Sequence, residues 1–482
     1  MADVWNVDVA RIDTQGNLYL NGGISYNADS VVLVQASSTD IGRYSNLQDA
    51  YASAKTLKPG GNELSSKNRA AIILPSGVYD SESNSLLLDT DYVDIIAQSP
   101  EVITKTHIDY SKTHTGLTEL GWLTVDFPLP RTRLLGSPAS GRSVVEQSVE
   151  DVRLIGFSIE CYYDGTGVDE KEFGFYCDAP EGGKYSYYEK MTFYSDIWDG
   201  VGSRYYNLPT NHKYHFDGEW VDCVGCDYSF RLSNENDLGT PVPNSQEWRA
   251  VMRNCHAGSY SFAGDSLSGI IKGAYVEACT SAGASFGGCS YHACASDADT
   301  KYIECKAIPY GNSFSLGHEC EASLIRCSGG PLCCGATAST SKPGIFSGYA
   351  EDCRFGKGSL GGRGDAGLGI PADGTNYYMS GTVVGCIVTG TEKNHYLKGA
   401  SIRNSIFVSD VTKDCFRLLD GESEIFKSIL GVDSDDTGTI VESDSSNNVV
   451  FLSNIINNID QNSTGLGSNV TNISGSKSWG LV

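Results

Sequence analysis

The sequence has few methionines, few cations and no long apolar run. Its 482 residues include only 4 Met against 55 Gly, a balance that suits turn-rich β structure better than a bundle of helices. Lys and Arg number 35 against 59 Asp and Glu, which gives a formal net charge of −24. Because a phosphate backbone attracts cations, this charge argues against a nucleic-acid partner. No segment reaches the roughly 18 apolar residues of a membrane span, so we expect no membrane insertion.

The first residues, MADVWNVDVARIDTQGN, also lack the basic and apolar regions of a secretory signal peptide. The chain nevertheless contains 16 Cys. Thiols without an export signal are typical of proteins that fold in a reducing compartment. We therefore expect this protein to be assembled in a host cytoplasm.

A short phrase recurs between Trp220 and Asn454. It ends at Cys223, Cys255, Cys279, Cys305, Cys327, Cys353 and Cys386 as WVDC, VMRNC, YVEAC, YIEC, LIRC, YAEDC and VVGC, and it continues as SIRNS, IFKS and FLSN. Successive copies are separated by between 19 residues (Cys386 to Ser405) and 33 residues (Cys353 to Cys386), a period typical of stacked repeats. The runs are short and rich in Val, Ile and Tyr, with Gly, Ser and Asn between them. They predict short strands joined by tight turns.

Repeats of this length fit one coil of a parallel β-helix, in which each strand pairs with its counterpart on the next coil at about 4.8 Å. The Cys position would form an internal ladder, since a buried thiol behaves as a small hydrophobe. An apolar residue follows a ladder Cys by seven residues in most units and predicts a second internal stack: Phe230, Phe262, Phe286, Cys334 and Leu360. Recurrence at one position explains the many cysteines without a disulfide scaffold.

The period, the Cys/Ser/Asn stack and the Phe stack resemble those of the pectin-lyase-like superfamily. The amino-terminal passage resembles it too: SNLQDAYASAKTL at residues 45–57 predicts a helix capped by Ser45 or Asn46, and NRAAIILPSGVYD and SLLLDTDYVDIIAQS predict strands. The resemblance implies an all-β fold, a right-handed parallel β-helix with an amino-terminal capping helix.

We expect three parts in the chain. Residues 1–40 form a β-rich leader, residues 41–460 form the parallel β-helix with loop excursions at 100–148 and 160–220, and residues 461–482 form a polar carboxy-terminal tail. The leader is too small to bury a core of its own, so it should pack against the first coil, a second copy or a larger assembly. By analogy, many phage tailspikes begin with such a leader, which docks onto the particle.

The third position of the phrase is the most informative for chemistry. Aligned there, the phrases give one column: Asp222, Arg253, Glu277, Glu304, Arg326, Glu351, Gly385, Arg403 and Lys427. A bulge is expected to absorb the extra residue of VMRNC, YVEAC and YAEDC. The column mostly alternates in sign, which by itself predicts only a solvated ladder of salt bridges.

The adjacent acids Glu277 and Glu304 are the exception. Two carboxylates on neighbouring coils should not both ionise easily, so we expect one to keep its proton, as general acid and base catalysis requires. Their spacing suits retaining glycoside hydrolysis, whereas Glu304 and Glu351, two coils or about 9.6 Å apart, are nearer the inverting spacing. Arg253 and Arg326 bracket the pair and could hold an acidic sugar or stabilise the enolate of a lyase. Hydrolysis and elimination both remain open.

Further substrate contacts are predicted at Asp222 and at three aromatic residues of the Gly-rich region, Trp198, Tyr205 and Tyr206. Aromatic faces can stack on the apolar face of a sugar ring, although core packing or a subunit interface would explain them equally well. A weaker cluster, His212, His215, Asp217 and Glu219, could supply a base or a metal site, although it meets no established metal-ligand spacing. Because no metal-ligand spacing and no phosphate loop is present, we expect no metal and no cofactor.

These features predict a virion-associated receptor-binding protein of the phage tailspike kind. It would bind, and in the enzymatic interpretation depolymerise, a bacterial surface polysaccharide. We expect a homotrimer that attaches to a virion tail or capsid protein through residues 1–40. One alternative is a free polysaccharide lyase or glycoside hydrolase of the same fold, and another is a non-catalytic virion fibre or decoration protein.

Overall fold

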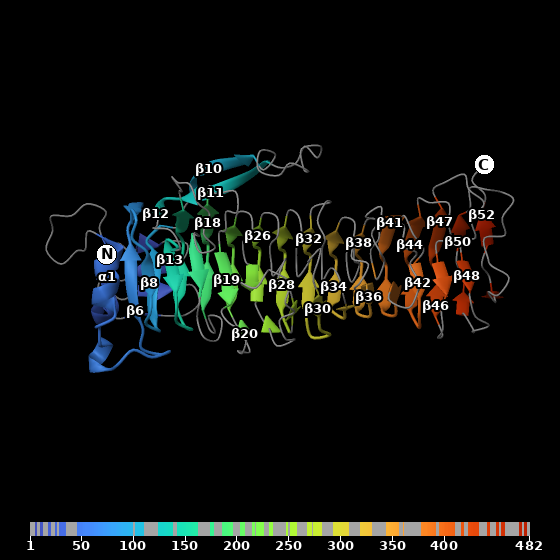
Figure 1. The fold of residues 1–482 in the computed structure, drawn as a ribbon, viewed down its shortest axis with the longest axis horizontal. Coiled ribbons are helices and arrows are strands. Elements are labelled where there is room, and N and C mark those ends of the chain that lie inside the picture. Colours follow the sequence, from blue (N-terminus) through green and yellow to red (C-terminus); the bar gives the residue numbers. More distant parts are fainter. Residues whose placement is uncertain are drawn as a thin grey trace. The chain divides into compact units, whose positions relative to one another are not determined.

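Parallel strand pairing dominates the computed structural model of the chain (Figure 1). Two units are distinguished: an amino-terminal unit (residues 1–208, 214–230 and 250–258) and a carboxy-terminal unit (residues 209–213, 231–249 and 259–482). The structure describes backbone and side chains for residues 29–34, 46–99, 130–137, 142–161, 174–175, 186–193, 218–223, 251–255, 273–280, 297–306, 320–329, 345–355, 360, 378–388, 397–407 and 423–428. Elsewhere it describes the backbone of helices and strands.

The amino-terminal unit contains three parallel sheets, which we call A, B and C. Sheet A runs in the order β5 (Val31–Leu33), β6 (Ala70–Leu74), β9 (Val93–Ala97), β14 (Arg153–Ile155), β17 (Tyr187–Glu189), β21 (Glu219–Val221) and β25 (Val251–Arg253). Sheet B runs in the order β7 (Gly77–Asp80), β12 (Thr132–Gly136), β15 (Ser158–Cys161), β18 (Thr192–Ser195), β22 (Val224–Gly225) and β26 (His256–Ala257). Sheet C contains β8 (Leu86–Leu88), β13 (Val145–Gln147), β16 (Phe175–Cys177) and β19 (Ser203–Asn207).

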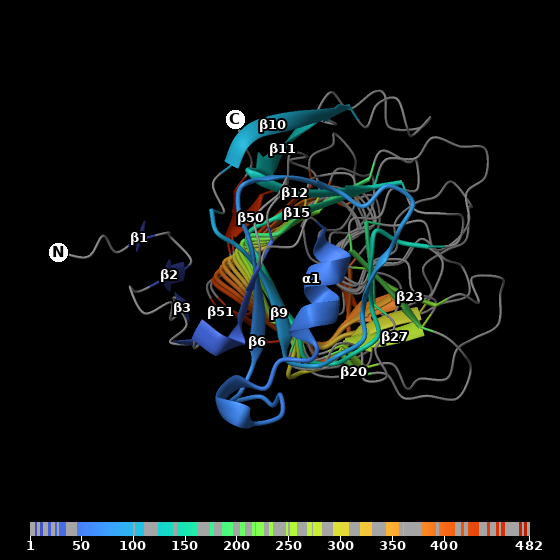
Figure 2. The same ribbon diagram turned by 90° about the vertical axis from the view of Figure 1, so that its left-hand side faces the viewer.

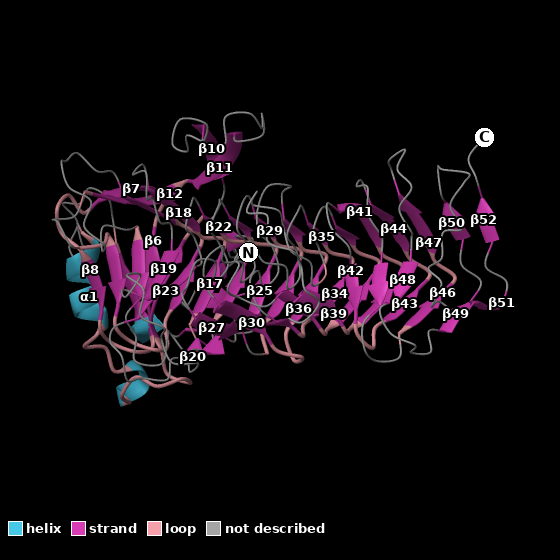
Figure 3. Cartoon of the chain, turned by 45° about the vertical axis from the view of Figure 1, so that its right-hand side comes forward, coloured by secondary structure: helices cyan, strands magenta, loops and turns pink. Residues whose placement is uncertain are grey.

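The carboxy-terminal unit also contains three parallel sheets (Figure 3), and its sheet C is a different sheet from the one of that name in the amino-terminal unit. Its sheet A contains β28 (Tyr275–Glu277), β31 (Lys301–Ile303), β34 (Ser323–Ile325), β37 (Tyr349–Glu351), β40 (Thr382–Val384), β43 (Ser401–Arg403), β46 (Glu424–Phe426), β49 (Val450–Leu452) and β51 (Asn472–Ser474). Sheet B contains β29 (Thr280–Ser281), β32 (Lys306–Ala307), β35 (Ser328–Gly329), β38 (Arg354–Phe355), β41 (Ile387–Thr391), β44 (Ile406–Ser409), β47 (Ile429–Val432), β50 (Ile455–Asn457) and β52 (Lys477–Trp479). Sheet C contains β24 (Glu247–Trp248), β27 (Ser268–Ile271), β30 (Ala293–Ser296), β33 (Glu319–Cys320), β36 (Gly344–Phe346), β39 (Tyr377–Met379), β42 (His395–Leu397), β45 (Phe416–Leu418) and β48 (Val441–Ser443).

Each strand pairs with strands that come one full coil earlier and later in the chain, so each unit is a right-handed parallel β-helix, as predicted. The predicted capping helix is also confirmed. It is α1 (Leu47–Ala54), and the side chain of Asn46 accepts a hydrogen bond from the backbone N–H of Asp49 at 2.7 Å. Figure 2 shows α1 lying across the end of the first coil. Its own residues Leu47, Ala50, Tyr51 and Ala54 are buried. The helix therefore covers apolar side chains that the end of a solenoid would otherwise leave in water.

A left-handed turn joins sheet A to sheet B in the described coils from β14 and β15 onward. Counted back from the Cys, each copy of the phrase has five residues: position 1 begins the sheet A strand, position 2 is buried, position 3 ends the strand, position 4 makes the turn and position 5 is the ladder residue. Position 4 has a φ between 49° and 66° in the carboxy-terminal unit, at Ala278, Glu304, Arg326, Asp352, Gly385, Asn404 and Lys427. Its N–H donates to the position 3 carbonyl of the next coil, for example from Glu304 to Ile325 at 2.8 Å. This bond holds the strained conformation in place.

Position 5 forms the predicted internal ladder. Its members are Phe157, Met191, Cys223 and Cys255 in the amino-terminal unit and Cys279, Cys305, Cys327, Cys353, Cys386, Ser405 and Ser428 in the carboxy-terminal unit, and all are buried. The N–H of Cys327 donates to the Cys353 sulfur at 3.3 Å, and the N–H of Cys386 donates to the Ser405 hydroxyl at 3.2 Å. Burial raises the pKa of the Cys327 thiol well above its usual range. The ladder thiols are therefore packing and hydrogen-bonding groups, not nucleophiles.

The segments predicted as leader, excursions and tail contain further strands. Within residues 1–40, β1 (Trp5–Asn6), β2 (Ala10–Ile12), β3 (Leu18–Leu20) and β4 (Ser25–Tyr26) form an antiparallel sheet, while β5 joins sheet A next to the 3-10 helices η1 (Ala28–Ser30) and η2 (Pro59–Gly61). Within 100–148, only β10 (Val102–Asp109) and β11 (Thr124–Pro130) leave the sheets, as an antiparallel hairpin. Residues 160–220 contain regular strands of all three sheets, and also β20 (His215–Phe216), while β51 and β52 extend sheets A and B into residues 461–482. The remaining strand is β23 (Arg231–Asn234) in the carboxy-terminal unit.

Two further findings concern expectations from the sequence. No helix among the described residues is both long and apolar enough to cross a membrane. Of the residues predicted to form a second internal stack, Phe230, Phe262, Phe286 and Cys334 lie outside the described residues, whereas Leu360 is buried.

Candidate functional site

The outward face of sheet A carries a recurring pair of side chains, Tyr at position 1 and Glu at position 3 of the phrase. Positions 1 and 3 face away from the buried position 2 because side chains alternate along a strand. In β17, β28 and β37 the Tyr hydroxyl donates to the carboxylate two residues later. The three hydrogen bonds run from Tyr187 to Glu189 at 3.0 Å, from Tyr275 to Glu277 at 3.2 Å, and from Tyr349 to Glu351 at 3.0 Å. We call these the Tyr-Glu pairs.

The pair in the amino-terminal unit lies between aliphatic neighbours. Glu189 is half-buried on β17, and its row in sheet A contains Ile155 on β14 and Val221 on β21. Ile155 is only 1% exposed. Burial raises the pKa of the Glu189 carboxyl above its usual range, because an apolar environment disfavours the charged form. Burial likewise raises the pKa of Tyr187, so the phenol keeps the proton that it donates to Glu189.

Charged and polar groups surround this pair on the next coils. Glu219 lies beside Tyr187 on β21 and forms an ion pair with Arg253 of β25. Asp222 occupies the left-handed position 4 and accepts a hydrogen bond from the Asn254 side chain at 2.8 Å. Arg253 and Asp222, both predicted to contact substrate, thus lie within two coils of each other on one face. Of the weaker cluster predicted around His212, only the side chain of Glu219 is described.

In the carboxy-terminal unit, two Tyr-Glu pairs flank an aliphatic floor. Ile303 of β31 and Ile325 of β34 occupy position 3 between Glu277 of β28 and Glu351 of β37, and both are half-buried. Because β28 and β37 are three strand steps apart, the two pairs are separated by about 14 Å along the sheet. The position 3 row is therefore an apolar strip with a carboxylate at each end, and the position 1 row beside it runs from Tyr275 through Lys301 and Ser323 to Tyr349.

The predicted alignment of Glu277 with Glu304 is wrong. Glu277 is at position 3 and pairs in register with Ile303, whereas Glu304 is the position 4 residue of its own coil, with a φ of 55°. No bulge accommodates an extra residue, because every phrase has the same length when it is counted from its ladder residue. The predicted column therefore separates into two: Arg253, Glu277, Glu351 and Arg403 at position 3, and Asp222, Glu304, Arg326, Gly385 and Lys427 at position 4.

Glu304 has a different partner from the one predicted. Arg326, at position 4 of the next coil, donates from Nε to Glu304 Oε1 at 2.9 Å, and its Nη2 lies 2.8 Å from the same oxygen. The two side chains are 54% and 53% exposed, so the pair is solvated. Glu304 and Arg326 thus form the simple surface ion pair that the charge pattern also predicted.

The remaining predicted contacts lie outside the described side chains. Trp198 is not among the described residues, and Tyr205 and Tyr206 belong to β19, where only the backbone is described. Among the described residues, no group of three or more His, Cys, Asp or Glu side chains is placed to bind a metal ion.

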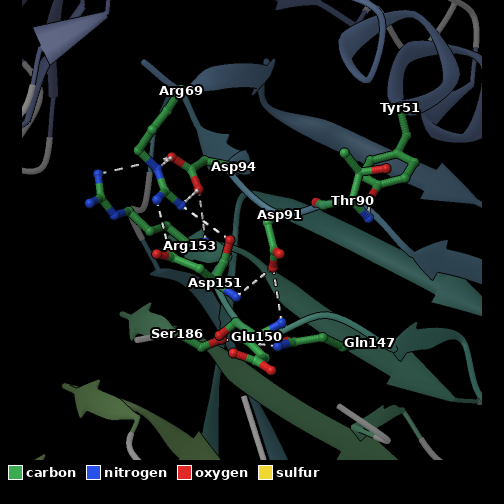
Figure 4. A network of polar contacts seen from close by, with 10 residues as sticks. All are labelled: Tyr51, Arg69, Thr90, Asp91, Asp94, Gln147, Glu150, Asp151, Arg153 and Ser186. Carbon is green, nitrogen blue, oxygen red and sulfur yellow. Dashed lines mark hydrogen bonds and ion pairs between the residues drawn. The ribbon is translucent and has the colours of Figure 1, made fainter. Parts of the chain in front are cut away.

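A buried ionic network joins the first coils of the amino-terminal unit (Figure 4). Arg69 donates to both carboxylate oxygens of Asp94, at 2.7 and 2.5 Å, and to Asp151 at 2.7 Å. The side chains of Arg69 and Asp94 are 3% and 0% exposed. Asp94 also accepts from the backbone N–H of Arg153 at 3.0 Å, and Asp91 accepts from the N–H of Asp151 at 2.9 Å. These bonds join residues of three successive coils inside the protein, so the network is structural.

Sequence reasoning missed Tyr187 and Glu189, although a signal was present. The segment YYEKM at 187–191 is a further copy of the phrase with Met191 in the ladder position, and RLIGF at 153–157 is another with Phe157 there. A search anchored on Cys passes over both copies. A search that allows any apolar residue at position 5 finds them and the first Tyr-Glu pair.

No protein-family model matches the sequence, and no curated protein matches it. Among solved structures, the chain is similar to pectin methylesterase PemA from Erwinia chrysanthemi, with 11% identity over 74% of this chain and 78% of that one and a TM-score of 0.29. It is also similar to the catalytic domain of a GH87 alpha-1,3-glucanase in complex with nigerose, with 10% identity over 94% of this chain and 69% of that one and a TM-score of 0.42. Both are pectin-lyase-like parallel β-helix proteins. The fold assignment of this chain rests on its own strand pairing.

Proposed function

We propose that the protein binds a bacterial surface polysaccharide on the outward face of sheet A and cleaves it. The observation that carries the proposal is the recurrence of the Tyr-Glu pairs on one face. A tyrosine ring offers an apolar surface to the C–H face of a sugar, and a carboxylate accepts hydrogen bonds from sugar hydroxyls. A glycan is itself a repeating chain, so it suits a face on which the same two groups return after three strand steps.

The aliphatic floor of Ile303 and Ile325 supports the same proposal. An extended ligand that spans the two Tyr-Glu pairs of the carboxy-terminal unit would cover both isoleucines and reach a carboxylate at each end. Binding sites of this kind combine a mostly apolar surface with a few polar groups that fix orientation. The ion pair of Glu304 and Arg326 borders the strip and would contribute polar contacts at its edge.

Affinity electrophoresis against purified capsule and lipopolysaccharide from a panel of bacterial strains tests the binding. For a polymer that retards the protein, the double variant Tyr275→Ala, Tyr349→Ala should bind at least tenfold more weakly, because each substitution removes a ring beside one end of the strip. Glu424→Ala is a matched control, since Glu424 is at position 1 of the same sheet but pairs with Arg403 at 2.7 Å. Undiminished binding by the double variant, or no polymer bound by the wild type, would contradict the proposal.

The finer proposal is that the protein is a receptor-binding protein of the phage tailspike kind, assembled as a homotrimer in the host cytoplasm and attached to a virion through residues 1–40. The antiparallel sheet of β1 to β4 supports it, because these strands pair among themselves and not with sheets A, B or C. Analytical ultracentrifugation should give three times the 51.7 kDa chain mass, and added protein should compete with phage adsorption to sensitive cells. A monomer that does not compete would favour the free enzyme.

A further inference from the structure

The three Tyr-Glu pairs share their chemistry but not their surroundings. Glu189 has an aliphatic neighbour on both adjacent strands, and Ile155 on one of them is fully buried. Glu277 and Glu351 also adjoin aliphatic residues, yet Ile303, Ile325 and Val384 in their rows all remain half-buried. The carboxyl group of Glu189 is therefore the most desolvated of the three, and a carboxyl in such surroundings retains its proton at higher pH.

The groups that face Glu189 come from its own strand and from both neighbours. On β17 they are Tyr187, which donates to the carboxyl, and Lys190, which follows it at position 4. On β14, Arg153 pairs with Tyr187. On β21, Glu219 lies beside Tyr187, and Asp222 follows Val221, which pairs with Glu189. Lys190 lowers the pKa of Glu189 and Asp222 raises it, but burial is the largest effect.

Asp222 is the second carboxylate at this place, one coil from Glu189. The Asn254 side chain donates to Asp222 Oδ1 at 2.8 Å and thereby orients it. Asp222 is also held in the left-handed turn, where its N–H donates to the Arg253 carbonyl at 3.0 Å. One half-buried acid and one oriented carboxylate on adjacent coils have the two different environments that a proton donor and a carboxylate nucleophile require.

We propose that Glu189 is the proton donor, and Asp222 the nucleophile, of the polysaccharide cleavage, with Tyr187 as a positioning residue. This inference rests on the proposed function and assigns its reaction as hydrolysis of the retaining kind, which carboxylates on adjacent coils suit. Glu189 gives its proton to the glycosidic oxygen as the bond from that oxygen to the anomeric carbon breaks and the Asp222 carboxylate bonds to the anomeric carbon. In a second step a water molecule gives its proton to the Glu189 carboxylate, bonds to the anomeric carbon and releases Asp222. Each turnover thus consumes one water and produces one new reducing end.

Reducing-end release from a polymer that the wild type binds tests the assignment. Glu189→Gln should lower cleavage at least 100-fold, the range of a lost general acid, while binding and melting temperature stay near those of the wild type. Lys190→Gln supplies a second readout. Since removing the lysine charge raises the pKa of Glu189, the high-pH limit of activity should move upward, which a purely structural role would not produce. Glu424→Gln should match the wild type in both assays.

The possible outcomes separate the two proposals. A wild type that binds none of the polymers overturns the proposed function itself. A wild type that binds a polymer but cleaves none overturns the cleavage part of the proposed function together with the assignment of Glu189. A wild type that releases unsaturated products overturns only the assignment of Glu189. The assignment also fails if Glu189→Gln cleaves within tenfold of the wild type, or if Lys190→Gln leaves the pH profile in place.

Discussion

The ionic network of Arg69, Asp94 and Asp151 and the ion pair of Glu304 and Arg326 use similar bonds in opposite surroundings. The contacts are 2.5 to 2.7 Å long in the first and 2.8 to 2.9 Å long in the second. The side chains of Arg69 and Asp94 are 3% and 0% exposed, whereas those of Glu304 and Arg326 are 53% and 54% exposed. Bond length alone therefore says little about the contribution of an ion pair to stability.

The difference teaches that the first coils and the later coils are stabilised by different means. Arg69 precedes β6, Asp94 belongs to β9, and Asp151 precedes β14, so the buried network links three successive strands of sheet A. Later coils repeat a single turn and a single ladder, and their surface charges are separable from the fold. We therefore expect substitutions of charged residues to change the free energy of unfolding strongly in the first coils and weakly in the later coils.

The largest effect should come from Asp94→Ala. This change leaves the Arg69 guanidinium buried without its main partner, and such a loss costs about 3–5 kcal/mol. Urea unfolding followed by circular dichroism measures it. Because a buried pair is poorly screened, the loss should persist in 1 M salt. A cost below about 1 kcal/mol would show that buried and exposed pairs are equivalent here, contrary to our comparison.

A smaller loss is expected from Cys327→Ser. The hydroxyl can make the same hydrogen bonds as the thiol, as Ser405 and Ser428 do in later coils. Burying a more polar group in a site fitted to sulfur should cost roughly 1 kcal/mol. Chemical denaturation gives the free energy of unfolding of this variant and of Cys327→Asp. The Asp variant should lose far more stability, since it buries a carboxyl group without a partner. Equal losses in the two variants would contradict an apolar ladder.

A gain of similar size is expected from Ala278→Gly. Ala278 has a φ of 52°, and the left-handed conformation costs a residue with a Cβ about 1–2 kcal/mol. Glycine removes this strain but loses more chain entropy on folding, so the net stabilisation should be roughly 1 kcal/mol or less. The melting temperature should rise. A lower melting temperature would mean that the methyl group of Ala278 makes packing contacts worth more than the strain.

The smallest effect should come from Glu304→Gln. The substitution removes an exposed ion pair with Arg326, and such pairs contribute about 0–1 kcal/mol. Denaturation at low and high salt measures it, and the difference from wild type should disappear as salt increases. A salt-independent loss of several kcal/mol would contradict our conclusion that the exposed pair contributes little to stability.

The repeat allowed the β-helix, its cap and its thiol ladder to be predicted, because each of these follows from local pattern. Asn46 precedes an apolar-periodic run, and Cys recurs at the end of each short strand. The two acids Glu277 and Glu304 were misaligned because the phrases were compared from their first apolar residue, whereas the turn fixes them from the ladder residue. One residue of offset moves a side chain from the strand to the turn.

The buried network and the surroundings of Glu189 could not be predicted from local pattern. Arg69, Asp94 and Asp151 are separated by 25 and 57 residues, and they meet only through the pairing of β6, β9 and β14. The burial of Glu189 depends on Ile155, which is on a different coil. Both features require the register of the whole sheet. The sign of a charge is visible in a sequence, but its solvation is not.

The left-handed turns form a row of position 4 residues along one edge of sheet A, with one residue per coil. Each coil of the carboxy-terminal unit presents one residue there, and the natural set already includes an acid, a base, an amide, an alanine and a glycine without any change in the turn. An attached dye, sugar or metal chelator could therefore be moved along the solenoid in steps of about 4.8 Å by choosing which coil carries it. The fold therefore allows chemical groups to be attached at regular, chosen intervals along its length.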